Sequence, residues 1–271
     1  MIPSHLINSL ATAANTAIDN VLRTGAPGQT IPTGEMGFVA AVTVGGVYDI
    51  ATAWNAILQP HNLTVKMNGV FCHQSPKVTF TDSQGHLVSC ELADLLVVVE
   101  DYTATALRRW ASLAQAKMAS SRGGQTLSQP GDLRQLDLFL HWPPFTLPGK
   151  YAAGQRDFQA CAHAGSHLNC GRYGLISGQP YPDWHQQSPA IVMPAGGDKL
   201  GTFLAKMVET GQTSFGREAT GVNDDWSRTV DELMTCGLEF GKPSNDSVCR
   251  GAPSRRNVLK AIAPLARNPC G

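Results

Sequence analysis

Apolar residues recur at helical spacing over the first part of the chain and predict three helices. In residues 4–24 an apolar position returns every three or four residues, which is the pattern of an amphipathic helix. A second helix is predicted to begin at Gly34 and to be interrupted by Gly45-Gly46. A third is predicted over residues 48–58.

After residue 60 the helical spacing gives way to short β-rich runs. The segments LTVKM (63–67) and KVTFTD (77–82) have turn-forming residues nearby and predict two strands. Residues 92–100, LADLLVVVE, form a nearly continuous apolar run, as expected of a strand buried on both faces. We therefore expect a sheet over residues 60–118, wrapped by the N-terminal helices.

Residues 103–121, TATALRRWASLAQAKMASS, are compatible with two conformations. Their residue types favour a helix, in which Gln115 and Lys117 would project about 200° apart. A strand would place both side chains on one face, because strand side chains alternate. The apolar run at residues 95–99 needs partner strands, which favours the strand. Both conformations stay open at this point.

The C-terminal half has a less regular pattern. After a Gly/Ser/Gln-rich break at residues 120–132, irregular structure around aromatic residues is predicted for QLDLFLHWPPF and GRYGLISGQPYPDW. Helices are predicted for KLGTFLAKMVE and WSRTVDELMTCGLEF. We expect an α/β core with N-terminal helices over residues 1–120. Residues 121–271 should form a mainly helical or irregular region of open role, which could pack on that core.

Composition and charge restrict the class of protein. The formal net charge is zero, so no overall field attracts the chain to nucleic acid or to a membrane, and any polyanion site must be local. The N-terminus lacks a basic leader with a cleavage site, and the longest apolar stretch is strand-sized. The seven cysteines are scattered and fit reduced thiols. We expect a cytoplasmic protein with no membrane partner.

The candidate chemistry lies around the apolar strand. A metal-dependent phosphodiesterase needs acids to hold Mg²⁺ and a lysine beside the scissile phosphate. Asp94 stands at the start of the apolar run, and Gln115-Ala116-Lys117 follows after enough residues for a strand, a turn and a second strand. In a strand, Gln115 and Lys117 would point the same way.

These residues resemble the PD-(D/E)XK nuclease superfamily, and in particular its Mrr-like restriction-endonuclease branch, in which Gln replaces the second acid to give a QxK motif. The resemblance rests on Ala93-Asp94, the LLVVV run and the Gln115-x-Lys117 motif, and it covers about residues 30–120. It implies a restriction-endonuclease-like mixed sheet flanked by helices. It also implies Mg²⁺- or Mn²⁺-dependent cleavage of DNA, serving restriction or anti-phage defence.

The resemblance also implies roles for individual residues. Asp94 would be a metal ligand, Gln115 a weaker neutral ligand or a water-orienting group, and Lys117 the catalytic lysine. Glu35, on a helix before the sheet, would complete the metal site. Ala93 departs from the family pattern, which has Pro there. Because Gln115 brings no charge, Glu35 or Glu91 would have to compensate.

Each of these residues has an ordinary explanation when taken alone. Asp94 could be a carboxylate at the end of a strand, and Lys117 could be a surface lysine. Glu35 could be an acid in the first turn of a helix, where it interacts favourably with the helix dipole. Two other functions therefore stay open. One is a non-catalytic interaction protein on a nuclease-like fold, and the other is a toxin or effector nuclease that acts on RNA.

Two further groups of residues were candidates for binding. The candidate DNA contacts are Arg108, Arg109, Arg255, Arg256 and Lys260, although a solvated helix face would look the same.

The other group is Cys161, His163, His167 and Cys170. These are zinc-ligand types, but their spacing is too compressed for the usual ligand pairs, so we expect no structural zinc. The sequence leaves a homodimer open.

Overall fold

The computed structural model describes residues 2–103, 106–120, 123–149, 151–160, 167–220 and 224–239. The helices are α1 (Ser4–Thr24), α2 (Gly34–Ala41), α3 (Val47–Leu58), α4 (Pro130–His141), α5 (Leu200–Met207) and α6 (Asp225–Glu239). The longer strands are β1 (Thr64–Phe71), β2 (Lys77–Thr81), β3 (Leu87–Glu91), β4 (Leu95–Thr103), β5 (Ala106–Met118), β9 (Gly171–Ile176) and β10 (Trp184–Gln187). The two-residue strands are β6 (Gln125–Thr126), β7 (Phe145–Thr146), β8 (Gln155–Arg156), β11 (Val192–Met193), β12 (Asp198–Lys199) and β13 (Arg217–Glu218).

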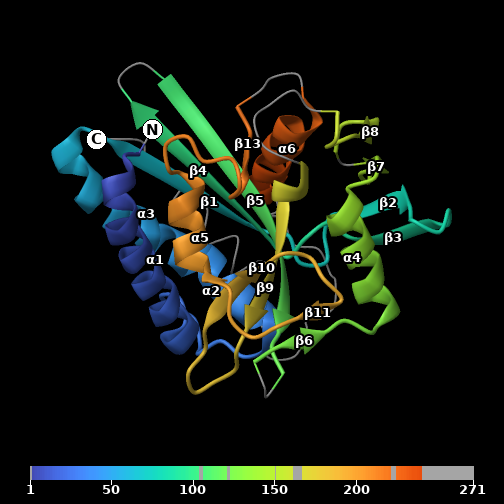
Figure 1. Cartoon of the computed structure of the whole chain (residues 1–271), viewed down its shortest axis with the longest axis horizontal. Helices are drawn as coiled ribbons and strands as arrows, with labels where there is room; N and C mark the ends of the chain where they lie inside the picture. Colours follow the sequence, from blue (N-terminus) through green and yellow to red (C-terminus); the bar gives the residue numbers. More distant parts are fainter. Residues whose placement is uncertain are drawn as a thin grey trace.

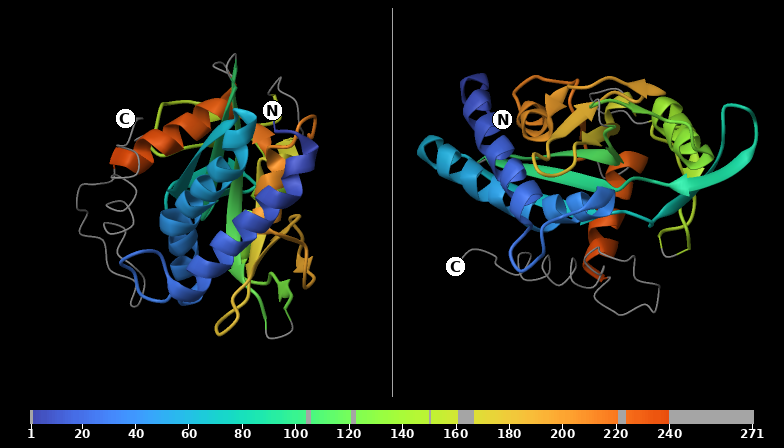
Figure 2. Two further views of the ribbon diagram at one scale, coloured as in Figure 1. Left: turned by 90° about the vertical axis from the view of Figure 1, so that its left-hand side faces the viewer. Right: turned by 90° about the horizontal axis from the view of Figure 1, so that it is seen from below.

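A seven-stranded mixed sheet, curled and flanked by helices, forms the centre of this α/β fold (Figure 1). Its strand order is β1-β4-β5-β9-β10-β12, with β13 added along β5. β1, β4 and β5 are antiparallel neighbours, whereas β9 runs parallel to β5. One face packs against α1, α2, α3 and α5, and the other packs against α4 and α6. Figure 2 shows α1 and α3 side by side over the first face.

The apolar run of β4 supplies both faces of this sheet, as the sequence predicted. Leu95, Val97 and Val99 belong to the core beneath α1 and α3. Leu96 and Val98 belong to the core beneath α4 and α6. Alternation of strand side chains explains why one continuous apolar run serves two layers.

Residues 106–118 form a strand, so the helical alternative is wrong. β5 pairs with β4 from Ala106 to Ala114 and with β9 from Leu113 to Met118, and its alanines Ala111, Ala114 and Ala116 are at most 5% exposed. The Ala-rich composition that favours a helix locally also allows two helical layers to pack close to the sheet. Burial of β4 on both sides overrides the weak local propensity.

The Gly45-Gly46 pair does not interrupt the second helix as predicted. The chain passes from α2 through a π-helical segment, Val42–Gly46, directly into α3. A Cβ atom on Gly45 would lie 2.8 Å from the Cβ of Ala26. The glycine therefore permits close packing against the segment after α1 instead of ending the helix.

This continuous helical run, Gly34–His61, is long and apolar enough to cross a membrane by length and composition alone. Within the molecule, however, 67% of its most apolar stretch is buried. A core helix of a soluble protein meets the same criterion, and the run packs in that way against α1 and β1.

The predicted strand KVTFTD lies outside the central sheet. β2 pairs with β3 and β7 in a separate four-stranded sheet of order β3-β2-β7-β8. Of the two early strands that the sequence offered as partners for β4, only β1 pairs with it. The other partner is β5.

Two segments predicted to be irregular are regular elements. QLDLFLH lies within α4, and GRYGLI forms β9 in the middle of the central sheet. The prediction was wrong because the glycines of β9 do not form turns. They lie within a strand and allow large side chains to pack closely against it. A Cβ atom on Gly171 would collide with the ring of Phe139, and one on Gly174 would collide with the indole of Trp184.

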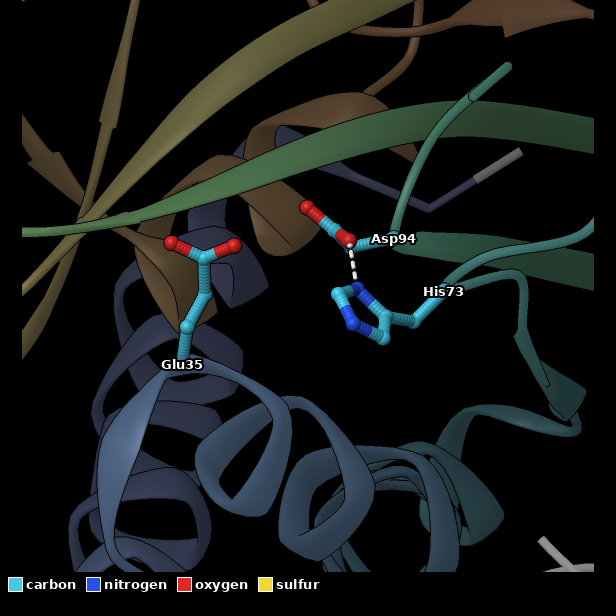
Figure 3. Close-up of side chains that lie close together, drawn as sticks. All are labelled: Glu35, His73 and Asp94. Carbon is cyan, nitrogen blue, oxygen red and sulfur yellow. Dashed lines mark hydrogen bonds and ion pairs between the residues drawn. The ribbon is translucent and has the colours of Figure 1, made fainter. Parts of the chain in front are cut away.

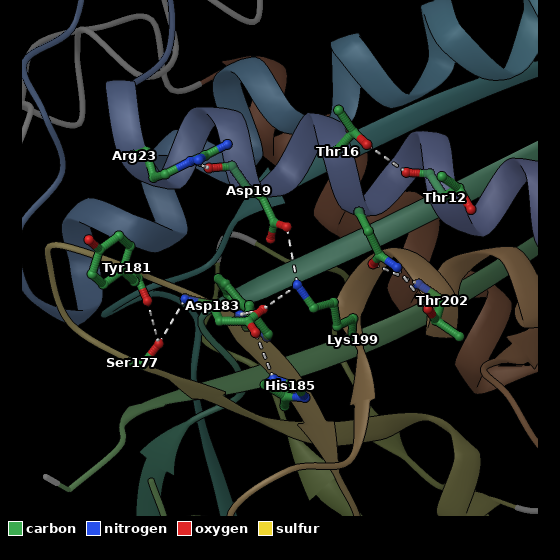
Figure 4. Close-up of polar contacts among 12 residues, drawn as sticks. Thr12, Thr16, Asp19, Arg23, Ser177, Tyr181, Asp183, His185, Lys199 and Thr202 are labelled. Carbon is green, nitrogen blue, oxygen red and sulfur yellow. Dashed lines mark hydrogen bonds and ion pairs between the residues drawn. The ribbon is translucent and has the colours of Figure 1, made fainter.

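The central sheet extends across the predicted break at residues 120–132. β9, β10 and β12 come from the C-terminal half and continue the sheet beyond β5. A polar network adds to this connection (Figure 4). Lys199 Nζ lies 3.1 Å from Asp19 Oδ2 of α1 and 3.2 Å from Asp183 Oδ1. The described C-terminal half is thus built onto the N-terminal helices.

The packing of β9 can be tested with Gly174→Ala. The added methyl group meets the buried Trp184 indole, and overpacking of this kind costs about 1–3 kcal/mol. We expect a loss of about 2 kcal/mol in the free energy of unfolding, measured by urea denaturation. Gly178→Ala is the matched control, because no atom lies within 4 Å of its added Cβ. Equal stability of the two variants would contradict the packing role.

Candidate functional site

Polar side chains gather at one end of the central sheet. β1 ends, β4 begins and β5 ends at this edge, because the three strands are antiparallel with Phe71 opposite Leu95 and Leu95 opposite Ala114. His73 therefore follows β1 where Asp94 precedes β4. α2 begins close by with Glu35, and Figure 3 shows its carboxyl turned towards His73 and Asp94.

Asp94 is the centre of the cluster and has no exposed surface. Its Oδ1 lies 2.5 Å from Nδ1 of His73. Its Oδ2 accepts hydrogen bonds from the Ala116 backbone N–H at 2.8 Å and from Nε2 of Gln115. The backbone N–H of Asp94 donates to the Ala114 carbonyl at 3.0 Å. These bonds compensate for burial of the carboxylate and fix its direction.

Gln115 is 1% exposed, and only one end of its amide is used. Nε2 donates to Asp94, whereas Oε1 has no hydrogen-bond partner among the described residues. A buried amide oxygen without a partner costs about 1–3 kcal/mol. The amide cannot simply turn over, because Oε1 would then face the Asp94 carboxylate, which is also an acceptor. The free oxygen is available to a ligand.

Lys117 shares a face of β5 with Gln115, as a strand requires, and its side chain is 12% exposed. Nζ lies 2.9 Å from Oδ1 of Asp132 and 4.0 Å from Oε1 of Glu35. Burial acts to lower the pKa of Lys117, but the charge of Glu35 and the hydrogen bond and charge of Asp132 outweigh it and raise that pKa. The lysine stays protonated.

Glu35 lies in the first turn of α2, and its side chain is 26% exposed. Burial of its carboxyl, with a smaller contribution from Asp94, raises its pKa from 4.5 to about 7, although the charge of Lys117 opposes the change. A raised pKa produced by burial next to charged groups is a feature of functional sites.

His73 is a residue of the cluster that the sequence analysis did not predict. One ligand atom each from Glu35, His73 and Asp94 lies within 4.8 Å of the others. Burial acts to lower the pKa of His73, but its hydrogen bond to Asp94 and the charges of Asp94 and Glu91 raise it. The local sequence gives no signal for this histidine, because its position next to Asp94 depends on the register between β1 and β4.

Two more acids complete the surroundings. Glu91 Oε2 lies 3.8 Å from His73 Nδ1, and burial raises the pKa of Glu91. Asp132, in the first turn of α4, holds Lys117. Sequence analysis had placed Asp132 in a linker. The helical pattern that follows it was the signal that could have found it.

The predicted DNA contacts on β5 lie far from this cluster. Arg108 lies 3.9 Å from Glu218, and Arg109 lies 2.6 Å from Asp231. At about 3.3 Å per residue, the nine positions that separate Arg108 from Lys117 correspond to about 30 Å. The other three predicted contacts, Arg255, Arg256 and Lys260, lie outside the described residues.

The cysteine-histidine group is described only in part. Cys161 and His163 lie outside the described residues. Cys170 is fully buried and accepts a hydrogen bond from Arg217 at 3.4 Å. Within the described ranges, the one group of His, Cys, Asp and Glu arranged to hold a metal ion is Glu35, His73 and Asp94.

The chain matches no family model, and no curated protein or solved structure is significantly similar to it. Its function must therefore be inferred from the fold and from the geometry of this cluster.

The raised pKa of Glu35 predicts a pH-dependent effect of Glu35→Gln in metal-free protein. Because the pKa is higher in the folded state, about 7 against 4.5, the wild type loses stability as the pH rises from 4.5 to 7. The variant avoids this loss. At pH 8 we expect it to be more stable by about 1–2 kcal/mol. A fully shielded group would give about 3 kcal/mol, but this side chain is 26% exposed.

The measurement is urea denaturation of both proteins in a chelator at pH 4 and pH 8. The two should have nearly equal stability at pH 4, where Glu35 is protonated in both the folded and the unfolded state. A stability difference that does not change between the two pH values would show that Glu35 does not have this raised pKa.

Proposed function

We propose that the chain is a metal-dependent DNA endonuclease of the PD-(D/E)XK type, with a restriction-endonuclease-like core. The observation that carries the proposal is that Gln115 and Lys117 share a face of β5 beside the buried Asp94. The order of the elements supports it as well. A Glu-bearing helix, antiparallel strands, an acid before an apolar strand and a QxK strand follow one another along the chain.

The residues at the site fit a divalent cation. Glu35 and Asp94 supply carboxylates, and the unpartnered Oε1 of Gln115 supplies a neutral oxygen. Oxygen ligands of these kinds suit Mg²⁺ and Mn²⁺. When bound, such an ion polarises the phosphodiester and lowers the pKa of a coordinated water.

Lys117 has the position and the protonation state to stabilise charge on the phosphate. Asp132 directs its ammonium group towards the side of Glu35, and the surrounding acids keep it protonated. A fixed cation in a partly buried site stabilises developing negative charge more strongly than the same cation in water. Asp94 orients Gln115 and the end of β5 through its two hydrogen bonds from that strand.

Other parts of the proposal rest on the resemblance alone. They are the choice of DNA as substrate and a role in restriction or anti-phage defence. The expected cytoplasmic location rests instead on the scattered cysteines, and a homodimer stays open. The second candidate function, a non-catalytic interaction protein, has one observation in its favour. Arg108 and Arg109 are engaged by acids of the same chain, so they are not a free surface for a polyanion.

The proposed function is tested by incubating plasmid DNA with Mg²⁺ or Mn²⁺ and wild type, Lys117→Met or Asp94→Asn. We expect cleavage by the wild type and a rate lower by about 100-fold or more in each variant. Lys117→Met removes the cation beside the phosphate, and Asp94→Asn removes a charged ligand of the metal ion. Lys66→Met is the matched control, because Lys66 is exposed on β1 and contacts the ring of Tyr102. Circular dichroism verifies folding.

Cleavage at equal rates by all four proteins would refute the assignment of the site. A folded wild type that cleaves RNA and leaves DNA intact would favour the toxin or effector alternative. A folded wild type that cleaves neither would favour the non-catalytic interaction protein.

A further inference from the structure

The candidate metal cluster differs from an all-oxygen site by one atom. Nδ1 of His73 lies among the carboxylate oxygens of Glu35 and Asp94, and one such atom from each residue is within 4.8 Å of the others. Mg²⁺ is usually bound by one or two carboxylates and several waters. Imidazole nitrogen is typical of first-row transition metals.

The spacing of these atoms suits a single octahedral ion. With ligand bonds of about 2.1 Å, adjacent ligand atoms lie about 3 Å apart and opposite ones about 4.2 Å apart. His73 Nδ1 and Asp94 Oδ1 are 2.5 Å apart, so the imidazole has to move by only about 0.5 Å. The Glu35 carboxylate lies within 4.8 Å of both atoms, so it has to approach by at most about 2 Å to take an adjacent position.

A second, independent observation indicates a missing ligand at this place. Gln115 is almost completely buried. Its Oε1 has no hydrogen-bond partner in the described part of the chain, while Nε2 of the same amide donates to Asp94. The amide is therefore held against the Asp94 carboxylate of the cluster. A cation between Asp94 and His73 would give this oxygen the partner that the described residues do not supply.

The charge around the cluster also favours a cation. Glu91 adds a third carboxyl group to those of Glu35 and Asp94, and its Oε2 lies 3.8 Å from His73 Nδ1. The ammonium group of Lys117 is engaged by Asp132 on α4, 2.9 Å away, and lies 4.0 Å from Oε1 of Glu35. Among the described residues, His73 Nδ1 lies near Asp94 Oδ1 and Glu91 Oε2, and Asp94 Oδ2 accepts hydrogen bonds from Gln115 and from the β5 backbone.

We propose that this site takes a first-row transition-metal dication in preference to Mg²⁺, and that His73 Nδ1 is the ligand responsible. The inference specifies the metal of the proposed nuclease and so deepens that function. Mn²⁺ is the most demanding probe, because it binds most weakly in the transition-metal series. A preference for Mn²⁺ over Mg²⁺ thus implies a preference for the later metals.

The test is calorimetric titration of the full chain with Mn²⁺ and with Mg²⁺, in the absence of nucleic acid. We expect the wild type to bind Mn²⁺ at least about 10-fold more tightly than Mg²⁺. In His73→Asn we expect a loss of about 10–100-fold in Mn²⁺ affinity, the range seen when groups around a metal are removed. Mg²⁺ affinity should change by less than about 3-fold, because oxygen ligands hold that ion.

Controls separate ligation from a structural role of His73. Asn retains a hydrogen-bond donor towards Asp94, so His73→Asn should fold, and His73→Ala provides a second variant. His86→Ala is the matched control, because the side chain of His86 is 76% exposed on the β2–β3 turn. In the Mn²⁺-loaded wild type, pulsed electron paramagnetic resonance should show nitrogen hyperfine modulation. This signal should be lost in His73→Asn and retained in His86→Ala.

Equal affinities of the wild type for the two ions would overturn the inference. Unchanged Mn²⁺ affinity in His73→Asn, absence of nitrogen modulation, or no binding of either ion by folded wild type would also overturn it. The plasmid assay decides the nuclease function separately. Cleavage with Mg²⁺ and no preference for Mn²⁺ refutes only the metal inference. Binding of Mn²⁺ through His73 without cleavage of any nucleic acid refutes only the function.

Discussion

The hydrogen bonds of the buried Asp94 carboxylate are the constraint on which the rest of the site depends. A carboxylate without exposed surface is tolerated only when both oxygens are satisfied. Here one oxygen is satisfied by His73 after β1 and the other by Gln115 and the Ala116 backbone of β5. The same interaction joins the ends of three strands and brings together groups that can hold a cation. Asp94 therefore contributes both to the stability of the fold and to the candidate cation site.

Those hydrogen bonds require an exact register between β4 and β5. Leu95 lies opposite Ala114, which places Asp94 beside Gln115 on one face. A slip by one residue would turn Gln115 and Lys117 to the other face of the sheet, into the layer packed by α1 and α3. The two apolar cores prevent this, because β4 contributes side chains to both of them. Burial of the strand on two sides thus fixes the polar site at its end.

The acids of the site outnumber its cations. Glu35, Asp94 and Asp132 stand near Lys117, and Lys117 is held mainly by Asp132. The pKa of the Glu35 carboxyl is raised to about 7, and the amide oxygen of Gln115 has no hydrogen-bond partner among the described residues. Both features have a common physical explanation if a divalent cation belongs among these groups.

The sequence by itself determined the elements whose pattern is unambiguous, such as the amphipathic α1 and the apolar β4. It also supplied Asp94, Gln115 and Lys117 as candidates, because their spacing has a chemical meaning only on paired strands. Tertiary structure decided that β5 is a strand, since its Ala-rich residues favour a helix locally and only burial between two layers selects the strand. It also decided that His73 joins the site, because that contact depends on how β1 aligns with β4, which local sequence does not encode.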